Sequence, residues 1–376
     1  MISEKKIREI RVHLENAQNP LFFFDDDGDG LCSFLLLRRY RGSGKGVAVK
    51  GSSSLGKQYF RKVNELNPDY IFILDKPKVD AEFFKEVEKV NLPVVWIDHH
   101  EPFQQIPDFV NYYNSFSKPR KKKSEKGLNI DTETFGEPVT FISYMVSQRK
   151  EDLWLAVVGC ISDRFVPPFY SEFERIYPEL SVSRRSKLRD PFDILYCSGI
   201  GRVAQILNFA LMARTSDVVR LMKYMISCKN PYEVLNENPK NRFFHKRFRE
   251  IERKLEGLLK RAKKVAKGSG KVVFFKYKSE ESISSLLANR LSYFFPNKLI
   301  VVAREKGGNL SISLRGKGIS LILKEVLKGL ENGEGGGHLD ACGAKILEKD
   351  WETFKKLFEE ALKKHRRKSL ERALEK

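Results

Sequence analysis

The sequence predicts an α/β protein whose N-terminal part is a doubly wound, mostly parallel sheet, followed by a helical connector and a smaller C-terminal α/β domain. Short apolar runs alternate with helical patterns in the first part of the chain, as in folds built from β-α-β units. The strand pattern disappears from about residue 168 and returns after the turn at Gly268-Ser269-Gly270. We therefore expect three domains, at 1–167, 168–267 and 268–376.

Unalternated apolar runs, which are typical of strands buried on both faces, predict the strands of the first domain. They lie at 21–24, 47–49, 70–74, 94–97 and 109–113. Apolar residues at helical spacing predict the helices between and after these strands. The helices are expected at 3–17, 31–40, 59–66, 81–90, 138–148 and 153–161. Ligands of such sheets bind at the carboxyl ends of the strands, so we expect a site at that edge.

The rest of the chain is predicted to be helical up to residue 267 and mixed thereafter. The segment 240–267 is a long helix that carries twelve lysines and arginines, with its apolar residues on one face. In the last domain, strands are expected at 272–277, 299–304 and 310–315. Helices are expected at 282–294, 319–330 and 351–374, and a glycine loop at 333–337 precedes His338.

The chain is strongly basic, with 69 lysines and arginines against 49 acidic residues and a formal net charge of +20. Such a balance favours polyanionic partners, because each neutralised phosphate releases counterions. A lysine-rich solvated surface, as in heat-adapted proteins, is the alternative. Clusters at 118–126 and 240–267 favour single-stranded nucleic acid, while the cluster at 363–368 suits nucleic acid or a protein partner equally.

The remaining composition indicates a cytoplasmic protein. Five cysteines are scattered without a CxxC pair, which argues for reduced thiols and against a disulfide framework or a zinc ribbon. No apolar run is long enough to cross a membrane, and the N-terminus lacks a signal-peptide pattern. We expect no membrane partner, while the oligomeric state stays open and includes a homo-oligomer.

An acidic cluster follows the first predicted strand. Asp25, Asp27 and Asp29 alternate there, and in an extended turn their carboxylates would point the same way. Gly28 and Gly30 permit the tight backbone that such a turn requires. The cluster repels itself without a cation, so it suggests a metal site, with a solvated acidic turn as the alternative.

Asp75, the tripeptide Asp98-His99-His100 and Asp163 follow later predicted elements in the same manner. Taken singly, each has a structural explanation: an aspartate can cap a helix, and a histidine pair can be buried for packing. Carboxylates and imidazoles gathered at the ends of such elements together predict a site for divalent cations.

This ordered set of motifs resembles the DHH phosphoesterase superfamily, which takes its name from the tripeptide that begins at Asp98. The acidic segment 25–30 resembles its first motif, Asp75 its second and Asp163 its fourth. The glycine run before His338 resembles the loop of the DHH-associated C-terminal domain. Position 23 is Phe, where the small-substrate phosphatases of the superfamily carry His. The chain thereby looks most like the compact archaeal RecJ-like exonucleases.

The resemblance implies a role for each motif residue. Two Mn²⁺ ions, with Mg²⁺ or Co²⁺ as substitutes, would be held by Asp27, Asp29, Asp75, His99 and Asp163, with Asp75 bridging them. Catalysis would also use Asp25 at or beside the ligands, Asp98 to orient an imidazole, and His100 to contact the scissile phosphate. Substrate would be bound by Arg315, Gly335, Gly336, Gly337 and His338.

The implied activity is that of a Mn²⁺-dependent, single-strand-specific exonuclease acting on DNA, RNA or both. It would hydrolyse phosphodiester bonds by two-metal catalysis, in the 3′ to 5′ direction, in DNA repair or replication. A replication or repair partner of the GINS or Hef type is also implied. Two alternatives stay open: a phosphatase or nanoRNase acting on short oligonucleotides or nucleotide phosphates, and a non-catalytic replication scaffold.

Overall fold

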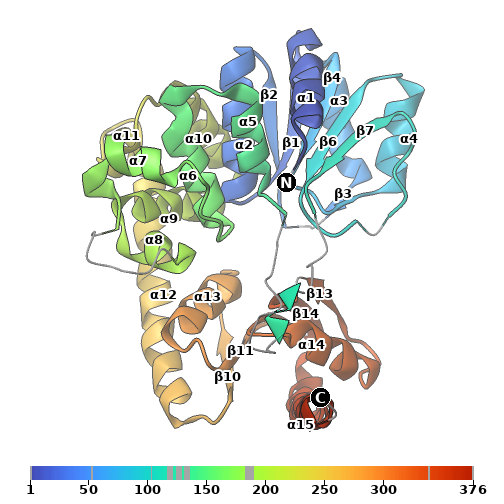
Figure 1. Ribbon diagram of the computed structural model, residues 1–376, viewed down its shortest axis with the longest axis vertical. Coiled ribbons are helices and arrows are strands. Elements are labelled where there is room, and N and C mark those ends of the chain that lie inside the picture. The colour runs from blue at the N-terminus through green and yellow to red at the C-terminus, as the bar shows by residue number, and fades with distance from the viewer. Residues whose placement is uncertain are drawn as a thin grey trace. The chain divides into compact units, whose positions relative to one another are not determined.

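The computed structural model describes residues 2–51, 54–102, 104–116, 122–123, 129–130, 136–182, 190–337 and 339–374. The chain divides into two compact units, Met1–Arg249 and Glu250–Lys376, and each has its own five-stranded sheet (Figure 1). Most of the basic segment 118–126 lies outside the described residues. The domain boundaries expected at residues 167 and 267 stay a prediction, and the helices after residue 167 belong to the first unit as far as Arg249.

The first unit is built on a parallel sheet in the order β2-β1-β4-β6-β7. Its strands are β1 (Pro20–Asp25), β2 (Lys45–Val49), β4 (Tyr70–Leu74), β6 (Val94–Asp98) and β7 (Val110–Asn114). The chain places β2 on one side of β1 and all later strands on the other, so the strand order switches between β1 and β4. In open parallel sheets, ligands bind at the carboxyl ends of the strands beside such a switch point.

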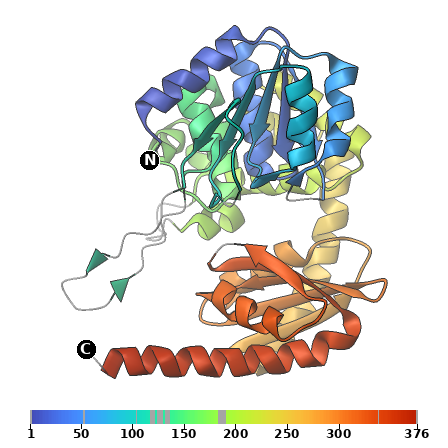
Figure 2. The same cartoon turned by 90° about the vertical axis from the view of Figure 1, so that its right-hand side faces the viewer.

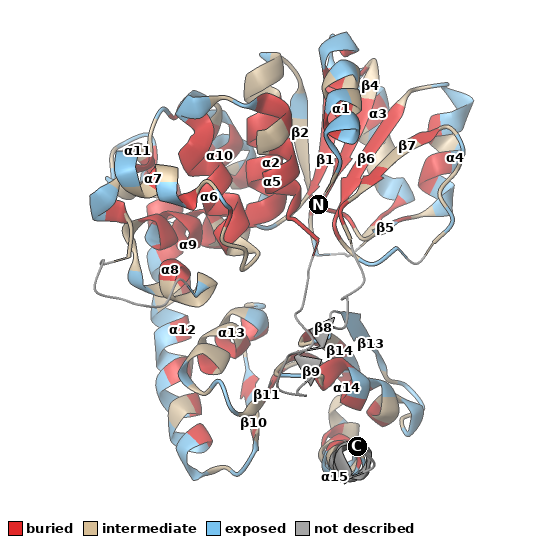
Figure 3. Ribbon diagram, in the orientation of Figure 1, coloured by how far each residue is buried: buried red, intermediate tan, exposed pale blue. Residues whose placement is uncertain are grey.

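Helices cover both faces of this sheet, which confirms the predicted doubly wound fold (Figures 1 and 3). The three consecutive phenylalanines of β1 place apolar rings on both faces of the sheet, because successive side chains of a strand point to opposite faces. Both faces therefore need a helix layer that covers them. Phe23 packs on the face of α4, 5.6 Å from the ring of Phe83, while Phe24 stacks 5.1 Å from Phe34 of α2. All four rings are buried, and each contributes roughly 1.5–3 kcal/mol relative to an exposed side chain.

The helices of this part are α1 (Glu4–Asn16), α2 (Gly28–Arg41), α3 (Arg61–Leu66), α4 (Ala81–Lys89), α5 (Val139–Ser147) and α6 (Leu153–Ser162). Short strands pair in two further sheets: β3 (Ser54–Leu55) with β5 (Lys78–Val79), and β8 (Lys122–Lys123) with β9 (Asn129–Ile130). Single 3-10 turns lie at Lys57–Phe60, Lys150–Asp152, Pro178–Leu180 and Glu348–Asp350.

The described residues between 168 and 267 contain helices and no strand, as the sequence predicts. They are α7 (Tyr170–Ile176), α8 (Pro191–Cys197), α9 (Gly199–Leu211), α10 (Thr215–Ser227), α11 (Pro231–Leu235) and α12 (Arg242–Gly268). A buried ion pair fixes α2 in the first unit, since Arg39 lies 2.8 Å from Asp152 and also donates to the carbonyl of Cys228. Within the described ranges, no single helix could cross a membrane by length and composition, although α8 and α9, bent by 81°, pass that test together.

The second unit has a mixed sheet in the order β10-β11-β12-β14-β13. Its strands are β10 (Val272–Lys278), β11 (Leu299–Lys306), β12 (Asn309–Arg315), β13 (Glu334–Gly337) and β14 (Ala341–Leu347), and only the β10–β11 pair is parallel. Its helices are α13 (Ser284–Phe294), α14 (Ile319–Lys328) and α15 (Trp351–Leu374). The apolar start of α15 packs with α14 on the sheet through Trp351, Phe354 and Phe358 (Figure 2). This unit confirms the smaller α/β domain.

The glycine segment before residue 338 is not the predicted loop. It is the edge strand β13, which pairs antiparallel with β14, and all four of its residues are exposed. Glycine permits this pairing because a Cβ on Gly335 would lie 2.6 Å from the carbonyl oxygen of Gly343. The strand β14 was not predicted either, because Cys342, Gly343 and Ala344 are small residues with weak strand preference.

Candidate metal centre

The first acidic motif lies where β1 turns into α2. Asp25 ends the strand, Asp27 caps the helix by accepting a hydrogen bond from the Gly30 amide at 3.0 Å, and Asp29 lies in the first helical turn. The expectation of an extended turn is therefore wrong, because the Asp27 cap starts the helix at once. Gly30 allows this abrupt start, since a Cβ there would lie 2.4 Å from the Asp25 carbonyl oxygen.

Asp29 is held by a helix that lies far away in the sequence. Its two carboxylate oxygens accept hydrogen bonds from the first amides of α5, those of Val139 at 2.9 Å and Thr140 at 2.7 Å. The amides at a helix N-terminus favour the ionised carboxylate. Burial nevertheless dominates, and with the repulsion from Asp163 it raises the pKa of Asp29 to about 6, against the opposing influence of His99. Ionisation of Asp29 near neutral pH therefore benefits from a nearby cation.

Asp75 follows β4 directly and has a left-handed backbone with φ of 58°. Such a conformation costs roughly 1–3 kcal/mol in a residue other than glycine, and it is found mainly at functional sites. The side chain is buried, and its Oδ1 makes no hydrogen bond of good geometry, although it forms an ion pair with Nε2 of His99 at 3.2 Å. Burial, followed by the charges of Asp29 and Asp27, raises the pKa of Asp75 well above its usual value. A buried carboxylate oxygen among other carboxylates is suited to bind a metal ion.

The two adjacent histidines have different partners. His99 lies between two carboxylates, with Nε2 beside Asp75 and Nδ1 3.6 Å from Oδ2 of Asp163. Burial lowers the pKa of His99, but Asp163 and Asp75 outweigh it and raise that pKa well above the usual value. His100 instead places Nδ1 2.8 Å from Oδ1 of Asp98, which is buried at the end of β6. The carboxylate of Asp98 thus orients the second imidazole.

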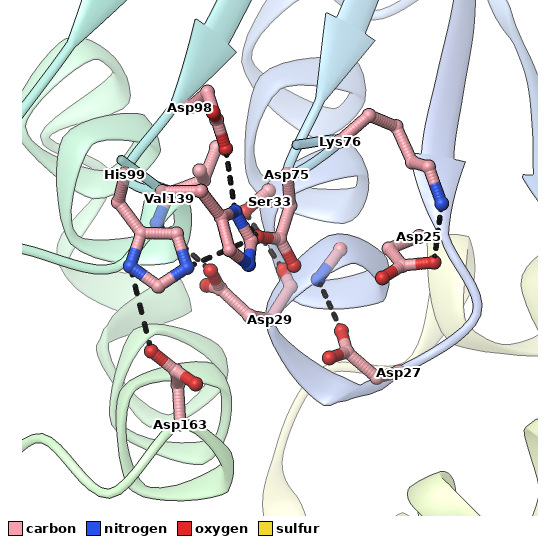
Figure 4. A network of polar contacts seen from close by, with 12 residues as sticks. Asp25, Asp27, Asp29, Ser33, Asp75, Lys76, Asp98, His99, Val139 and Asp163 are labelled. Atoms are coloured by element: carbon pink, nitrogen blue, oxygen red, sulfur yellow. Dashed lines mark hydrogen bonds and ion pairs between the residues drawn. The ribbon is translucent and has the colours of Figure 1, made fainter. Parts of the chain in front are cut away.

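Asp163 caps the C-terminal end of α6, the end that carries the negative pole of the helix dipole. A carboxylate at that position is unfavourable by itself, and a cation beside it would remove the penalty. Its Oδ2 lies on the side of His99, as Figure 4 shows.

The candidate ligands form three overlapping groups in which the ligand atoms lie within 4.8 Å of one another. These are Asp29 with His99 and Asp163, Asp25 with Asp27 and Asp75, and Asp75 with His99 and His100 (Figure 4). All predicted metal and catalytic residues of the first unit therefore lie at the edge of the sheet beside the switch point. Mixed carboxylate and imidazole oxygen and nitrogen donors suit Mn²⁺, and the buried Oδ1 of Asp75 fits the position of a ligand.

Two residues of this cluster carry no sequence signal that singles them out. Lys76 follows Asp75 and is fully buried, with Nζ 2.8 Å from Oδ1 of Asp25. Asn114 ends β7 and donates to Oδ2 of Asp98 at 3.4 Å and to the carbonyl oxygen of His100 at 2.9 Å. In a chain with 69 basic residues, one further lysine is inconspicuous until the fold places it among carboxylates.

Of the predicted substrate-binding residues, Arg315 and Gly337 lie at one end of the second sheet. Arg315 ends β12 opposite Ala341, and Gly337 ends β13 opposite Cys342, so both flank the start of β14. Nε of Arg315 donates to Asn289 at 2.6 Å, which fixes the guanidinium and identifies Asn289 as a further residue of this edge. His338 lies outside the described residues.

Comparison with known proteins gives a domain match in the second unit and a fold similarity over most of the chain. Residues 258–364 match the DHHA1 domain. The fold is similar to that of RecJ from Thermus thermophilus in complex with Mn²⁺, with a TM-score of 0.67 and 16% identity over 96% of this chain and 56% of that one. It is also similar to a manganese-bound exonuclease RecJ, with a TM-score of 0.60 and 16% identity over 95% of this chain and 94% of that one.

A third similar structure is CDC45 from Entamoeba histolytica, with a TM-score of 0.53 and 10% identity over 95% of this chain and 98% of that one. Among curated protein sequences, no significant match is found. The chain spans a little over half of the Thermus thermophilus RecJ chain. Residues 258–364 thus match the DHHA1 domain, and the chain has a fold similar to that of RecJ.

Proposed function

We propose that the chain is a Mn²⁺-dependent, single-strand-specific exonuclease that hydrolyses phosphodiester bonds of DNA, RNA or both, in the 3′ to 5′ direction. The observation that carries the proposal is the gathering of the buried Asp75 with four other carboxylates and two imidazoles, with Oδ1 of Asp75 3.2 Å from Nε2 of His99. Mg²⁺ or Co²⁺ could replace Mn²⁺ at such donors.

In this proposal, each part of the cluster has a separate task. Asp27, Asp29, Asp75, His99 and Asp163 would hold two cations, one at the group of Asp29, His99 and Asp163 and the other at the group of Asp27 and Asp75, where Asp25 also lies. The cations supply Lewis-acid charge to the attacking water and to the scissile phosphate. The rigid supports of the ligands, such as the α5 amides behind Asp29, keep the carboxylates in place during the reaction.

His100 is the residue that would contact the scissile phosphate. Asp98 engages its Nδ1, so Nε2 is the nitrogen directed to substrate, and Asn114 supports both residues. A carboxylate behind an imidazole selects its tautomer and stabilises its protonated form. The pair can therefore donate a hydrogen bond or a proton to the leaving oxygen.

The second unit would hold the substrate strand. At the exposed residues Gly335, Gly336 and Gly337 a phosphate can approach the backbone without obstruction by a Cβ, and Arg315 and His338 would add charge. The net charge of +20 supports a polyanionic substrate. The proposal also includes a cytoplasmic location, a homo-oligomeric state and a partner of the GINS or Hef type in replication or repair. The support for these comes from the composition of the chain and from its resemblance to the DHH phosphoesterase superfamily.

The test is hydrolysis of single strands labelled at either end, in Mn²⁺, by the wild type and by Asp75→Asn. Asparagine tolerates the left-handed backbone of residue 75, so the variant removes the charge without adding strain. We expect shortening from the 3′ end by the wild type and no cleavage by the variant. The matched control is Asp108→Asn, an exposed aspartate of the same unit, which should cleave normally.

Three results would contradict the proposal. Cleavage by Asp75→Asn at the wild-type rate would remove Asp75 from the metal centre. Activity confined to dinucleotides would indicate the phosphatase or nanoRNase alternative. Failure of the wild type to bind Mn²⁺ would indicate the non-catalytic scaffold.

A further inference from the structure

We propose that Lys76 is a built-in cation of the metal centre, and that it makes the position formed by Asp25, Asp27 and Asp75 the weaker of the two cation positions. The inference deepens the proposed function and rests on its two-cation centre. It concerns a residue that the family motifs do not include.

Lys76 is placed for this role by the fold around it. It is one of the largest fully buried side chains of the chain, and a buried lysine is rare unless its charge is paired. Its carbonyl oxygen accepts a hydrogen bond from Nε1 of Trp96 at 2.9 Å, which anchors the backbone at the end of β4. From there the side chain reaches across the switch point to Asp25 at the end of β1 (Figure 4).

The contact with Lys76 changes what Asp25 can offer to a metal. Oδ1 of Asp25 accepts hydrogen bonds from Nζ of Lys76 at 2.8 Å and from the amide of Asp26 at 3.0 Å. Oδ2 is then the oxygen that would face a cation, and the charge of the carboxylate is already balanced by the ammonium. A divalent cation at this position must also approach the fixed positive charge of Lys76, which opposes its binding.

The position formed by Asp29, His99 and Asp163 is built differently. The charge of Asp29 is supported by the amides of Val139 and Thr140, and Asp163 faces His99, which is itself a potential ligand. These partners supply partial charges or a donor nitrogen, so they compete less with an incoming cation. We therefore expect this position to fill first.

Lys76 also completes the charge balance of the filled centre. The carboxylates of Asp25, Asp27, Asp29, Asp75 and Asp163 carry five negative charges when ionised. Two divalent cations and one lysine neutralise them. The lysine thus holds the Asp25 carboxylate in place before the second cation arrives, which makes it a positioning residue.

The experiment is a titration of the metal-free full chain with Mn²⁺, followed by isothermal calorimetry and by the electron paramagnetic resonance signal of free Mn²⁺. We expect the wild type to bind two ions with affinities that differ at least tenfold. Lys76→Met, which keeps the shape and removes the charge, should tighten the weaker position at least tenfold. Lys76→Arg should retain the wild-type difference, and Lys85→Met, at an exposed lysine of α4, should change neither position.

Circular dichroism of each metal-free variant checks that it folds. If Lys76→Met does not fold, Asp25→Asn provides the second measurement, and it should weaken only the weaker position. Two equal affinities in the wild type, or an unchanged weaker position in a folded Lys76→Met, would overturn the inference and leave the proposed function intact. Absence of any Mn²⁺ binding by the wild type would overturn both.

Discussion

The two sites of this chain differ most in how far their residues are buried. In the first unit, Asp29, Asp75 and Asp98 are 1–2% exposed and His99 is 5% exposed, whereas Asp27 lies exposed at the rim of the cluster. In the second unit, every residue of the β13 edge is exposed. Burial holds ligands rigidly and strengthens their electrostatic interactions, which suits chemistry on one phosphate. An open edge of amides suits contact with an extended strand whose sequence does not matter.

The largest expected effect comes from a substitution in the buried metal centre of the first unit. His99→Ala removes an imidazole shared by two of the three ligand groups. Loss of a residue that only hydrogen-bonds to a metal ligand lowers activity roughly 10–100-fold. Because His99 would itself be a ligand, we expect kcat on a single strand to fall by more than this. Binding of the strand in EDTA should be unchanged, because the open edge is untouched. His13→Ala, on α1, is the matched control, and a folded His99→Ala with wild-type kcat would contradict the metal centre.

A smaller effect should appear in stability. At a fixed Mn²⁺ concentration a hundred times the Kd of the tighter position at pH 7.5, occupancy of that position should raise the free energy of unfolding by about 2.7 kcal/mol, measured by urea denaturation. The gain should be greater at pH 7.5 than at pH 5.5, since the pKa of Asp29 lies at about 6 and Mn²⁺ must displace its proton at the lower pH. Asp75→Asn should lose most of the gain. The same gain in that variant would place the bound ion elsewhere.

The variant Asp98→Asn tests whether Asp98 orients the His100 imidazole or instead binds a metal ion. The variant can no longer stabilise a protonated His100 by charge, so we expect kcat to fall by roughly 10–100-fold. Because Asp98 belongs to none of the three ligand groups, the affinity for Mn²⁺ in calorimetry should stay unchanged. A marked loss of Mn²⁺ binding would instead make Asp98 a ligand.

The smallest effects would sharpen the description of the open edge. A Cβ on Gly335 would lie 2.6 Å from a backbone oxygen, whereas a Cβ on Gly336 would meet no atom within 4 Å. We therefore expect Gly335→Ala to raise KM severalfold without changing kcat. Gly336→Ala should stay within about ±0.5 kcal/mol in stability and close to the wild type in KM. Equal effects of the two substitutions would show that the pairing of β13 with β14 does not shape the site.

Much of the fold follows from local patterns in the sequence. The apolar runs before Asp25, Asp75 and Asp98 have the length and composition of buried parallel strands, and all three aspartates lie at strand ends in the structure. Helix α15 begins and ends where the pattern predicts. The β13 strand was missed because it consists of glutamate and three glycines and pairs with the small residues at the start of β14, which leaves no apolar period to read.

By itself, the sequence therefore determined which residues stand at the carboxyl ends of the strands, because strand period and strand termination are local properties. The tertiary structure alone decided the partners that come from other elements: the α5 amides for Asp29, Asn114 for Asp98 and Lys76 for Asp25. Such pairs join residues on different strands and helices, and they form only when packing brings those elements together. Burial then shifts the pKa values of the clustered groups, and no local sequence pattern encodes that burial.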